Sequence, residues 1–315
     1  MVTVDEIEAA RRRLPPEVVQ TPLLPCPALH EGRPAFLKAE SLQVTGSYKA
    51  RAAFTVLASL DPAARQRGAV LASSGNFAAA FAFMGRRLGI PTAVVMMRKT
   101  APYKVERTHR LGAEVIFCDD RWDAREELLA RLEAERGLTV IHHYEDPRVI
   151  AGHGTIGLEI LEDCPEAGLV LVPVSSGGLL AGVAAAVKAR RPGARVIGVQ
   201  PEGADAMARS LEAGHVVSIP EARTMCDALV ATHPGELPFQ HAQRDVEAVV
   251  RVSEAEIAHA VRFLAIEAKL VAEPGGAVTT AALLSGRLRP AEGPTVALVS
   301  GGNVAPERLA ALLRV

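Results

Sequence analysis

Short apolar segments alternate with longer alanine-rich segments along most of the chain. The short ones are rich in Val, Ile and Leu, as in buried strands, and the longer ones carry apolar residues at helical spacing. Strands that alternate with helices in this way are typical of βαβ units and a parallel sheet. The expected strands are 35–38, 68–73, 90–97, 113–118, 139–142, 169–174, 196–199, 246–252 and 295–299. The expected helices are 5–14, 48–60, 78–88, 103–111, 122–135, 157–163, 179–189, 253–269 and 277–286.

This order of elements predicts an α/β fold with two open, twisted, mostly parallel sheets and helices on both faces of each. A chain of 315 residues has room for about two domains. The elements between Gly68 and Tyr144 form a compact βαβαβ unit, after which the pattern restarts. A less regular stretch, 201–238, carries loop-like Gly, Pro and Thr.

The composition argues against several classes of function. A net charge of -1 and an aromatic content of 4% give no basic, aromatic-rich surface for nucleic acid. The uncharged runs 68–85 and 168–187 are each shared between a strand and a helix, so we expect no membrane span. The amino terminus lacks the apolar core of a secretory signal. Because the four cysteines lie far apart without a Cys-Xaa-Xaa-Cys pair, we expect free thiols in a cytoplasmic protein.

The chemistry is expected at Lys49. Gly46 and Ser47 end the strand 35–38, and the Ser47 hydroxyl is a candidate N-cap for the helix 48–60. Lys49 then lies in the first helical turn, where the helix dipole and partial burial both favour its neutral amine. A neutral lysine can form a Schiff base with an aldehyde. An isolated Gly-Ser-Xaa-Lys is more often a surface lysine that follows a cap, so the flanking residues decide.

The segment 38–51 resembles the lysine motif of the fold-type II pyridoxal phosphate (PLP) enzymes, which have the fold of the tryptophan synthase β subunit. The pattern is that of the serine/threonine dehydratase and serine racemase branch, and the residues that fill it are Glu40, Gln43, Thr45, Gly46, Ser47, Lys49 and Arg51. Ala52 replaces the usual glycine, for which we expect a change in packing. The resemblance implies a large PLP-binding domain, residues 1–67 plus 145–315, and a small mobile domain, residues 68–144, that closes over the substrate.

A second motif lies between the strand 68–73 and the helix 78–88. Amides and hydroxyls at a helix start can hold a carboxylate, although a serine-rich turn alone is weak evidence. In the resembling enzymes this loop binds the substrate carboxylate, and the residues implied here are Ser73, Ser74, Gly75, Asn76 and Phe77. Asn76 matches the asparagine beside the cofactor's phenolic oxygen, and Ser74 matches the racemases' acid/base opposite the lysine. Phe77 replaces the usual histidine, which opens the site to a side chain larger or more apolar than that of serine.

Two further loops match the family in the same order. The loop after the strand 169–174 resembles its phosphate-binding loop, in which backbone amides hold a phosphate without a basic side chain. The residues concerned are Ser175, Ser176, Gly177, Gly178 and Leu179. Ser300 matches the serine that meets the pyridine nitrogen, and its hydroxyl cannot protonate that nitrogen, which suits elimination chemistry. The turn 273–277 matches a supporting Glu-Pro-Xaa-Gly-Ala motif.

Other cofactor sites are weakly indicated. The run 152–157 fits a dinucleotide-binding pattern, but no strand leads directly into it, and it also matches a structural segment of the PLP family. His142 and His143 are neighbours on an expected strand and point in different directions. The positions that match a divalent-ion site of eukaryotic serine racemases are Gln200, Ala204 and Ala206. Two carboxylates are thus absent, and unless Glu202 or Asp205 compensates we expect no metal site.

The resemblance implies PLP held by Lys49 and an ammonia-lyase (dehydratase) reaction. A β-hydroxy amino acid such as L-serine, L-threonine or 3-hydroxyaspartate would yield a 2-oxo acid and ammonia by α,β-elimination, with Lys49 as general base. A serine or amino-acid racemase that uses Lys49 and Ser74 on opposite faces is the alternative. A PLP-binding protein without turnover, suggested by Phe77 and Ala52, ranks lower. The expected partners are a small amino-acid substrate and a second copy in a homodimer, with neither nucleic acid nor membrane.

Overall fold

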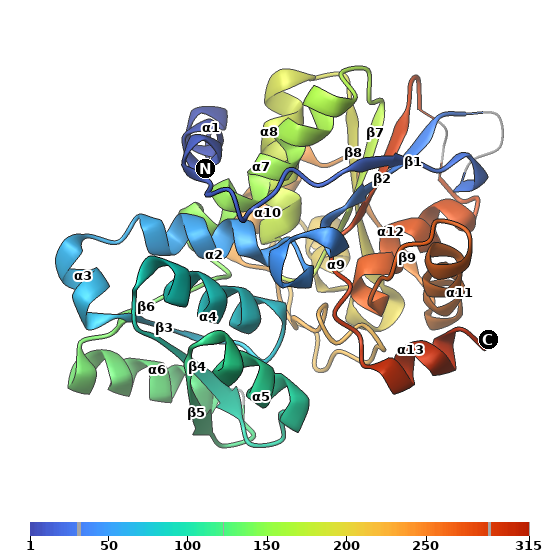
Figure 1. The fold of residues 1–315 in the computed structure, drawn as a ribbon. Coiled ribbons are helices and arrows are strands. Elements are labelled where there is room, and N and C mark those ends of the chain that lie inside the picture. The colour runs from blue at the N-terminus through green and yellow to red at the C-terminus, as the bar shows by residue number, and fades with distance from the viewer. Residues whose placement is uncertain (30–32, 122, 289–290, 315) are drawn as a thin grey trace.

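The computed structural model describes residues 1–29, 33–121, 123–288 and 291–314, and its strands form two sheets (Figure 1). The larger sheet has the order β1-β2-β10-β7-β8-β9, in which β1 pairs antiparallel with β2 and the other pairs are parallel. Its strands are β1 (Leu23–Pro25), β2 (Ala35–Ala39), β7 (Leu169–Pro173), β8 (Arg195–Pro201), β9 (Ala248–Val252) and β10 (Thr295–Val299). The smaller sheet is parallel, in the order β5-β4-β3-β6. Its strands are β3 (Ala69–Ala72), β4 (Thr92–Met97), β5 (Glu114–Cys118) and β6 (Thr139–Val140).

Helices connect the strands and cover the sheets. The α-helices are α1 (Val4–Arg13), α2 (Lys49–Ala58), α3 (Pro62–Arg67), α4 (Asn76–Leu88), α5 (Pro102–Leu111), α6 (Asp123–Arg136), α7 (Pro147–Asp163), α8 (Gly178–Arg190), α9 (Ala206–Ala213), α10 (Glu236–Asp245), α11 (Glu254–Ile266), α12 (Pro274–Leu284) and α13 (Pro306–Leu312). The 3₁₀ helices are η1 (Pro27–Leu29), η2 (Glu40–Leu42), η3 (Val44–Gly46) and η4 (Glu202–Ala204).

The larger sheet is buried on both faces. Successive residues of a strand point to opposite faces, so Leu169 and Leu171 of β7 pack in one core with α11 and α12, whereas Val170 and Val172 pack in a second core with α8 and α10. The uninterrupted apolar sequence of such a strand is therefore explained by helices on both sides.

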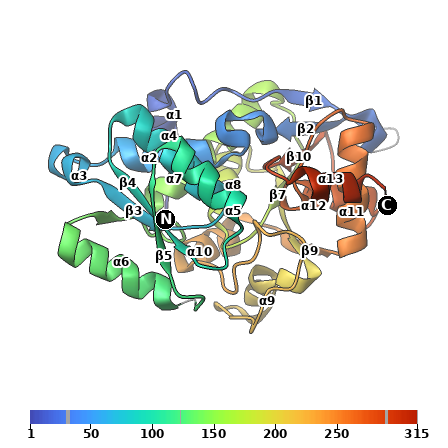
Figure 2. The same ribbon diagram turned by 60° about the horizontal axis from the view of Figure 1, so that its bottom comes forward.

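The smaller sheet follows the same rule. Leu71 of β3 shares a core with α2 and α4, and its neighbour Val70 shares another core with α6. Figures 1 and 2 both show α4 and α6 on opposite sides of this sheet. Helices on both faces of two mostly parallel sheets confirm the predicted fold class.

Helix α2 is fixed by buried charges as well as by its apolar face. The Arg51 guanidinium pairs with Glu40 at 2.8 Å and with Glu159 of α7 at 2.6 Å, and the Lys38 ammonium pairs with Glu159 at 2.8 Å. Burial by itself would raise the pKa of Glu159, but Arg51 and Lys38 hold that pKa below its usual range. The network joins β2, α2 and α7, and it therefore sets the position at which α2 begins.

The main departure from the predicted elements is α7. The sequence predicts a helix at 157–163, but the helix begins ten residues earlier, where Asp146 accepts a hydrogen bond from the Arg148 amide and a proline follows it. The run 152–157 is thus the middle of a helix. Its glycines allow close packing, since a Cβ at Gly152 would come within 2.7 Å of the α2 backbone.

Smaller departures occur where the hydrophobic pattern is short. The elements β1, α3, α9, α10 and α13 were not predicted, and α9 lies within the stretch 201–238 that was expected to be irregular. Helix α4 begins at Asn76 rather than at 78, whereas the strand 295–299 is as predicted. The expected helix start at Trp122 lies outside the described residues. Within the described ranges, no helix combines the length and the apolar character that a bilayer crossing requires.

Candidate active site

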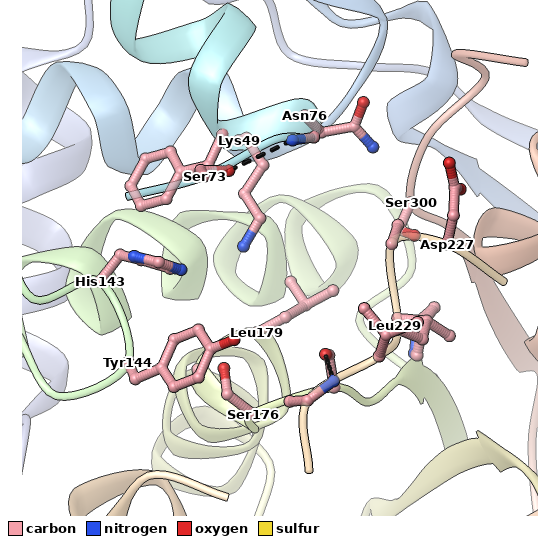
Figure 3. Close-up of a pocket in the computed structure, with 18 of the residues that line it drawn as sticks. Lys49, Ser73, Asn76, His143, Tyr144, Ser176, Leu179, Asp227, Leu229 and Ser300 are labelled. Carbon is pink, nitrogen blue, oxygen red and sulfur yellow. Dashed lines mark hydrogen bonds between the residues drawn. The ribbon is translucent and has the colours of Figure 1, made fainter. Parts of the chain in front are cut away.

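A cavity of about 180 Å³ lies where the carboxyl ends of β3, β7 and β10 meet the start of α2 (Figure 3). Ligands of open parallel sheets commonly bind at this end of the strands. The predicted site residues that line the cavity are Lys49, Ser73, Ser74, Gly75, Asn76, Phe77, Ser175, Ser176, Gly177, Gly178, Leu179 and Ser300. The tertiary structure thus brings together every residue that was predicted to be catalytic or to bind cofactor or substrate.

Lys49 is the first residue of α2 and so lies in the first helical turn, as predicted, but the helix is not capped as predicted. The N-cap is Tyr48, which makes no side-chain capping bond. The Ser47 side chain is fully buried, and its Oγ has no hydrogen-bond partner among the described residues. The prediction of a hydroxyl cap is therefore wrong. The chain instead turns into α2 through Thr45 and Gly46, whose φ values are 65° and 72°.

The environment of Lys49 favours its neutral amine. Burial lowers the pKa of Lys49 to about 7, and the nearby Glu273 acts in the opposite direction. The amine lies 4.6 Å from the centre of the Tyr48 ring and 5.1 Å from that of Phe77. In Figure 3 it points into the cavity between His143 on one side and Ser300 on the other. At neutral pH a large fraction of Lys49 is thus a nucleophile.

The Asn76 amide is oriented by two side chains from the carboxyl-terminal part of the chain. Asn303 Nδ2 donates to Asn76 Oδ1 at 2.7 Å and to the Thr45 carbonyl at 2.9 Å. Asn76 Nδ2 donates to Glu273 Oε1 at 2.6 Å. Both amide hydrogens of Asn303 are donated, so the atom of Asn76 that faces Asn303 must be an acceptor, its Oδ1. The Asn76 amino group then faces Glu273. Burial, and then the charge of Asp227, raise the pKa of Glu273 to about 8.

The loop before α8 presents backbone donors to the cavity. Gly177 is the N-cap of α8 and makes no side-chain capping bond, so the first amides of this helix are free of a side-chain acceptor. Gly177 has a φ of 104°, and a Cβ there would come within 2.5 Å of Met207. Ser175 Oγ accepts a hydrogen bond from the Ala231 amide at 3.3 Å, which leaves its hydroxyl hydrogen for a ligand. This arrangement can hold an anion such as a phosphate.

The remaining predicted serines also lie at the cavity. Ser73 Oγ accepts from the Gly75 amide at 3.3 Å, and Ser74 Oγ lies 3.1 Å from the Thr100 hydroxyl. Ser300 follows β10, and its carbonyl accepts from the Tyr48 amide at 3.1 Å, which ties this loop to the start of α2.

Several residues that line the cavity were not predicted as site residues. His143 was considered only as a metal ligand, yet its ring meets Phe77 edge-on at 5.3 Å. Burial, and then Lys49, lower the pKa of His143 to about 3, so this imidazole is neutral. The loop carries phenylalanine in place of histidine, and a different segment of the chain supplies an imidazole beside it. The other unassigned residues include Lys104, Arg125, Tyr144, His153, Asp227 and Leu229.

The alternative cofactor sites do not assemble. A dinucleotide loop at 152–157 is incompatible with the helical conformation of that run. Asp205, a possible substitute metal ligand, is paired with Arg209 at 2.7 Å and with Arg251 at 2.9 Å. The part of the chain that the structure describes holds no cluster of three or more His, Cys, Asp or Glu suited to a metal ion.

The donor set fits pyridoxal phosphate. The buried amine of Lys49 can capture an aldehyde, and the uncapped start of α8 can hold a phosphate. The Asn76 amide and the Ser300 hydroxyl lie at the same cavity, where polar atoms of a pyridine ring need partners.

Known proteins share this fold and sequence. A family model described as pyridoxal-phosphate dependent enzyme matches residues 14–301. The L-threonine ammonia-lyase of Thermotoga maritima is 41% identical over 307 residues, which cover 96% of this chain and 76% of that protein. Maize serine racemase has a TM-score of 0.95 at 33% identity and covers 99% of this chain and 97% of its own. A serine racemase from Dictyostelium discoideum has a TM-score of 0.90 at 31% identity, with coverage of 96% and 99%. A solved threonine deaminase has the same TM-score and coverage at 39% identity.

Fold and site together define a fold-type II enzyme in which a lysine at a helix start shares one cavity with the uncapped start of α8. The chain belongs to the pyridoxal-phosphate-dependent enzyme family, and pyridoxal phosphate is its cofactor. The predicted family, fold class and cofactor are therefore confirmed.

Proposed function

We propose that this enzyme is an ammonia-lyase that converts a β-hydroxy amino acid to a 2-oxo acid and ammonia by α,β-elimination. L-serine, L-threonine and 3-hydroxyaspartate are the candidate substrates. Similarity to proteins named L-threonine ammonia-lyase and threonine deaminase supports this function. The observation that carries it is the buried Lys49 amine, with a pKa near 7, in one cavity with the 73–77 loop.

Lys49 is proposed both to anchor the cofactor and to act as the general base. When bound, pyridoxal phosphate supplies an electron sink for the electron pair left after loss of the substrate's α-proton. The Lys49 amine takes up this proton, since a base with a pKa near 7 is matched to neutral pH. The substrate hydroxyl then takes up the proton that Lys49 returns and leaves as water, and a second water hydrolyses the resulting enamine to the 2-oxo acid and ammonia.

The other site residues are proposed to bind and orient. The amides and hydroxyls of Ser73, Ser74 and Gly75 would hold the substrate carboxylate at the start of α4. Asn76 and Ser300 would hold the cofactor ring, and residues 175–179 its phosphate. Phe77 and the rings beside it keep water from Lys49, which strengthens every polar contact in the cavity.

An amino-acid racemase is the second candidate. Ser74 lines the cavity beside Lys49, and maize serine racemase matches 99% of the chain. A racemase needs a second acid/base group on the far side of the substrate from Lys49, and the Ser74 hydroxyl would serve. Loss of racemisation with retained elimination in Ser74→Ala would support this assignment.

The chain-level proposals follow from the same site. We propose that the segment 68–144 moves as a small domain that closes over the substrate against 1–67 and 145–315, and that the enzyme is a homodimer. All four cysteines are free and buried, which supports a reducing, cytoplasmic location.

The decisive experiment combines a spectrum with product analysis. The purified enzyme should show the absorbance band of bound pyridoxal phosphate, which Lys49→Ala should lose. L-serine, L-threonine and L-threo-3-hydroxyaspartate are then assayed for 2-oxo acid, ammonia and D-isomer. Oxo acid from one of them supports the lyase, D-isomer without oxo acid supports the racemase, and a bound cofactor without any product indicates a PLP-binding protein without turnover.

A further inference from the structure

His153 is a buried histidine at the cavity that the proposed reaction does not use. It lies in α7, its side chain is 1% exposed, and it lines the same cavity as Lys49 and the 175–179 loop. Neither Nδ1 nor Nε2 has a hydrogen-bond partner among the described residues. Buried polar atoms are nearly always hydrogen-bonded, so an imidazole with two unpartnered nitrogens indicates a ligand.

The position of the ring points to the start of α8. A Cβ built at Gly178, the first residue of that helix, would lie 3.6 Å from His153 Nδ1. The opposite boundary is Tyr48, whose ring centre is 4.7 Å from that of His153. The imidazole therefore lies between the residue that precedes Lys49 and the uncapped helix start.

The ring cannot easily leave this position. A Cβ at Gly152 would meet the α2 backbone at 2.7 Å, and a Cβ at Gly154 would meet the Gly182 carbonyl of α8 at 2.9 Å. The residues on both sides of His153 thus let α7 pack in contact with two helices. This packing holds the imidazole at the loop.

We infer that His153 is a ligand of the cofactor phosphate, to which its imidazole N–H donates a hydrogen bond beside the amides of the α8 helix start. The inference rests on the proposed phosphate loop at 175–179. It does not depend on whether elimination or racemisation follows. A phosphate has more acceptor positions than one helix start fills, and a neutral imidazole supplies a donor without a permanent charge.

The charges around the ring agree with a neutral donor. Burial, and then Lys49, lower the pKa of His153 well below its usual value, with His143 and Arg51 acting in the same direction. The Gly178 backbone beside the ring acts in the opposite direction, which agrees with a ring placed at the start of α8. A phosphate dianion beside the ring would act against burial and the nearby cations and would stabilise the N–H that donates to it.

The test compares pyridoxal phosphate with pyridoxal, which lacks the phosphate. Apo-enzyme of each variant is titrated with both by isothermal calorimetry. His153→Leu should lower the affinity for pyridoxal phosphate about tenfold or more, since a buried hydrogen bond to a charged group is lost. The affinity for pyridoxal should change by less than about twofold. His153→Gln, which keeps a donor, should recover most of the difference. An equal loss for both ligands, or no loss, would overturn the inference.

Two controls separate the possible failures. His143→Leu removes another buried imidazole of the cavity and should change both affinities by the same factor. Gly178→Asp puts a carboxylate at the helix start, where the new Cβ would lie 3.6 Å from the His153 ring. If Gly178→Asp leaves the ratio of the two affinities unchanged, the 175–179 loop does not bind the phosphate, and the proposed site fails together with the inference.

A measurement on the unmodified enzyme covers the case in which His153→Leu does not fold. Holoenzyme labelled with ¹⁵N-histidine should show one ring N–H coupled through a hydrogen bond to the ³¹P of the cofactor, and His153→Gln should remove that signal. Absence of a coupled histidine in the holoenzyme would overturn the inference.

Discussion

Lys49 and Asn76 show how single residues acquire function from their surroundings. The amine of Lys49 is shifted by burial, and the Asn76 amide is turned by Asn303 and Glu273. In each case the motif supplies the functional group. Residues that lie near it in space but far away in sequence set the protonation state of the amine and the orientation of the amide.

The reactivity of Lys49 should depend on pH in a way that an exposed lysine would not show. A base with a lowered pKa is neutral above that pKa, so capture of pyridoxal by the apo-enzyme should rise about tenfold per pH unit below about 7 and level off above it. Stopped-flow absorbance measures this rate. A rate that still rises tenfold per unit well above pH 8 would contradict the low pKa, because an ordinary lysine titrates at about 10.4.

Substitution of Asn303 by aspartate should reduce activity more than substitution by alanine. Asn303→Asp replaces the donor with a carboxylate that faces the Thr45 carbonyl and Asn76 Oδ1, whereas Asn303→Ala only removes two bonds. Unpaired buried acceptors cost about 1–3 kcal/mol each, so kcat should fall about tenfold or more in the aspartate variant and less in the alanine variant. The absorbance maximum of the bound cofactor should shift in the same order, and equal effects would argue against the proposed orientation of Asn76.

At the scale of elements, the contact between α7 and α8 positions the proposed phosphate loop. Small residues let the two helices touch: a Cβ at Gly182 would lie 2.3 Å from the Ile150 carbonyl and 2.6 Å from the Gly154 amide. Both atoms belong to the backbone, which cannot move without shifting a helix. The glycines of the run 152–157 thus serve packing rather than nucleotide binding.

Gly182→Ala should therefore destabilise the protein. Helix propensity alone would make the alanine variant more stable than the wild-type protein by about 1 kcal/mol. Overpacking of the contact between α7 and α8 should destabilise it by about 1–3 kcal/mol. Urea unfolding of the apo-enzyme measures the change in the free energy of unfolding and therefore shows which of the two effects is larger. Gly193→Ala is the control, because apart from its chain neighbours no atom of the described residues lies within 4 Å of its Cβ position. Its free energy of unfolding should change by less than about 0.5 kcal/mol. A Gly182→Ala variant as stable as Gly193→Ala would contradict the close contact.

In the molecule as a whole, the cavity lies between the two sheets, and polar contacts beside it join the segment 68–144 to the rest of the chain. Lys104 of α5 pairs with Asp227, and Arg107 of the same helix donates to the Thr45 carbonyl at 2.8 Å. Helix α5 belongs to the smaller sheet, whereas Asp227 follows α9 in the stretch beside the larger one. These contacts can hold the segment 68–144 in the closed position that we propose.

Lys104→Met should weaken closure with little effect on folding. The pair is partly exposed, so its loss should change the free energy of unfolding by less than about 1 kcal/mol. The KM for the amino-acid substrate should rise about threefold or more and show less dependence on salt. Lys99→Met, at an exposed lysine of the same segment, should leave KM unchanged. An unchanged KM in Lys104→Met would mean that the pair does not take part in closure.

The amino-acid sequence was enough to predict the class of fold, the cofactor and the motif residues at the cavity, but not the other residues that line it. Apolar strands and alanine-rich helices alternate strongly enough to fix the layers, and Lys49, Asn76 and Ser300 stand in motifs whose local turns bring reactive groups to strand ends. The remaining features depend on contacts between segments that are distant in the sequence. The helical state of the glycine-rich run 152–157 depends on neighbouring helices, the neutral Lys49 depends on burial, and the approach of His153 to Gly178 joins segments that no local pattern connects.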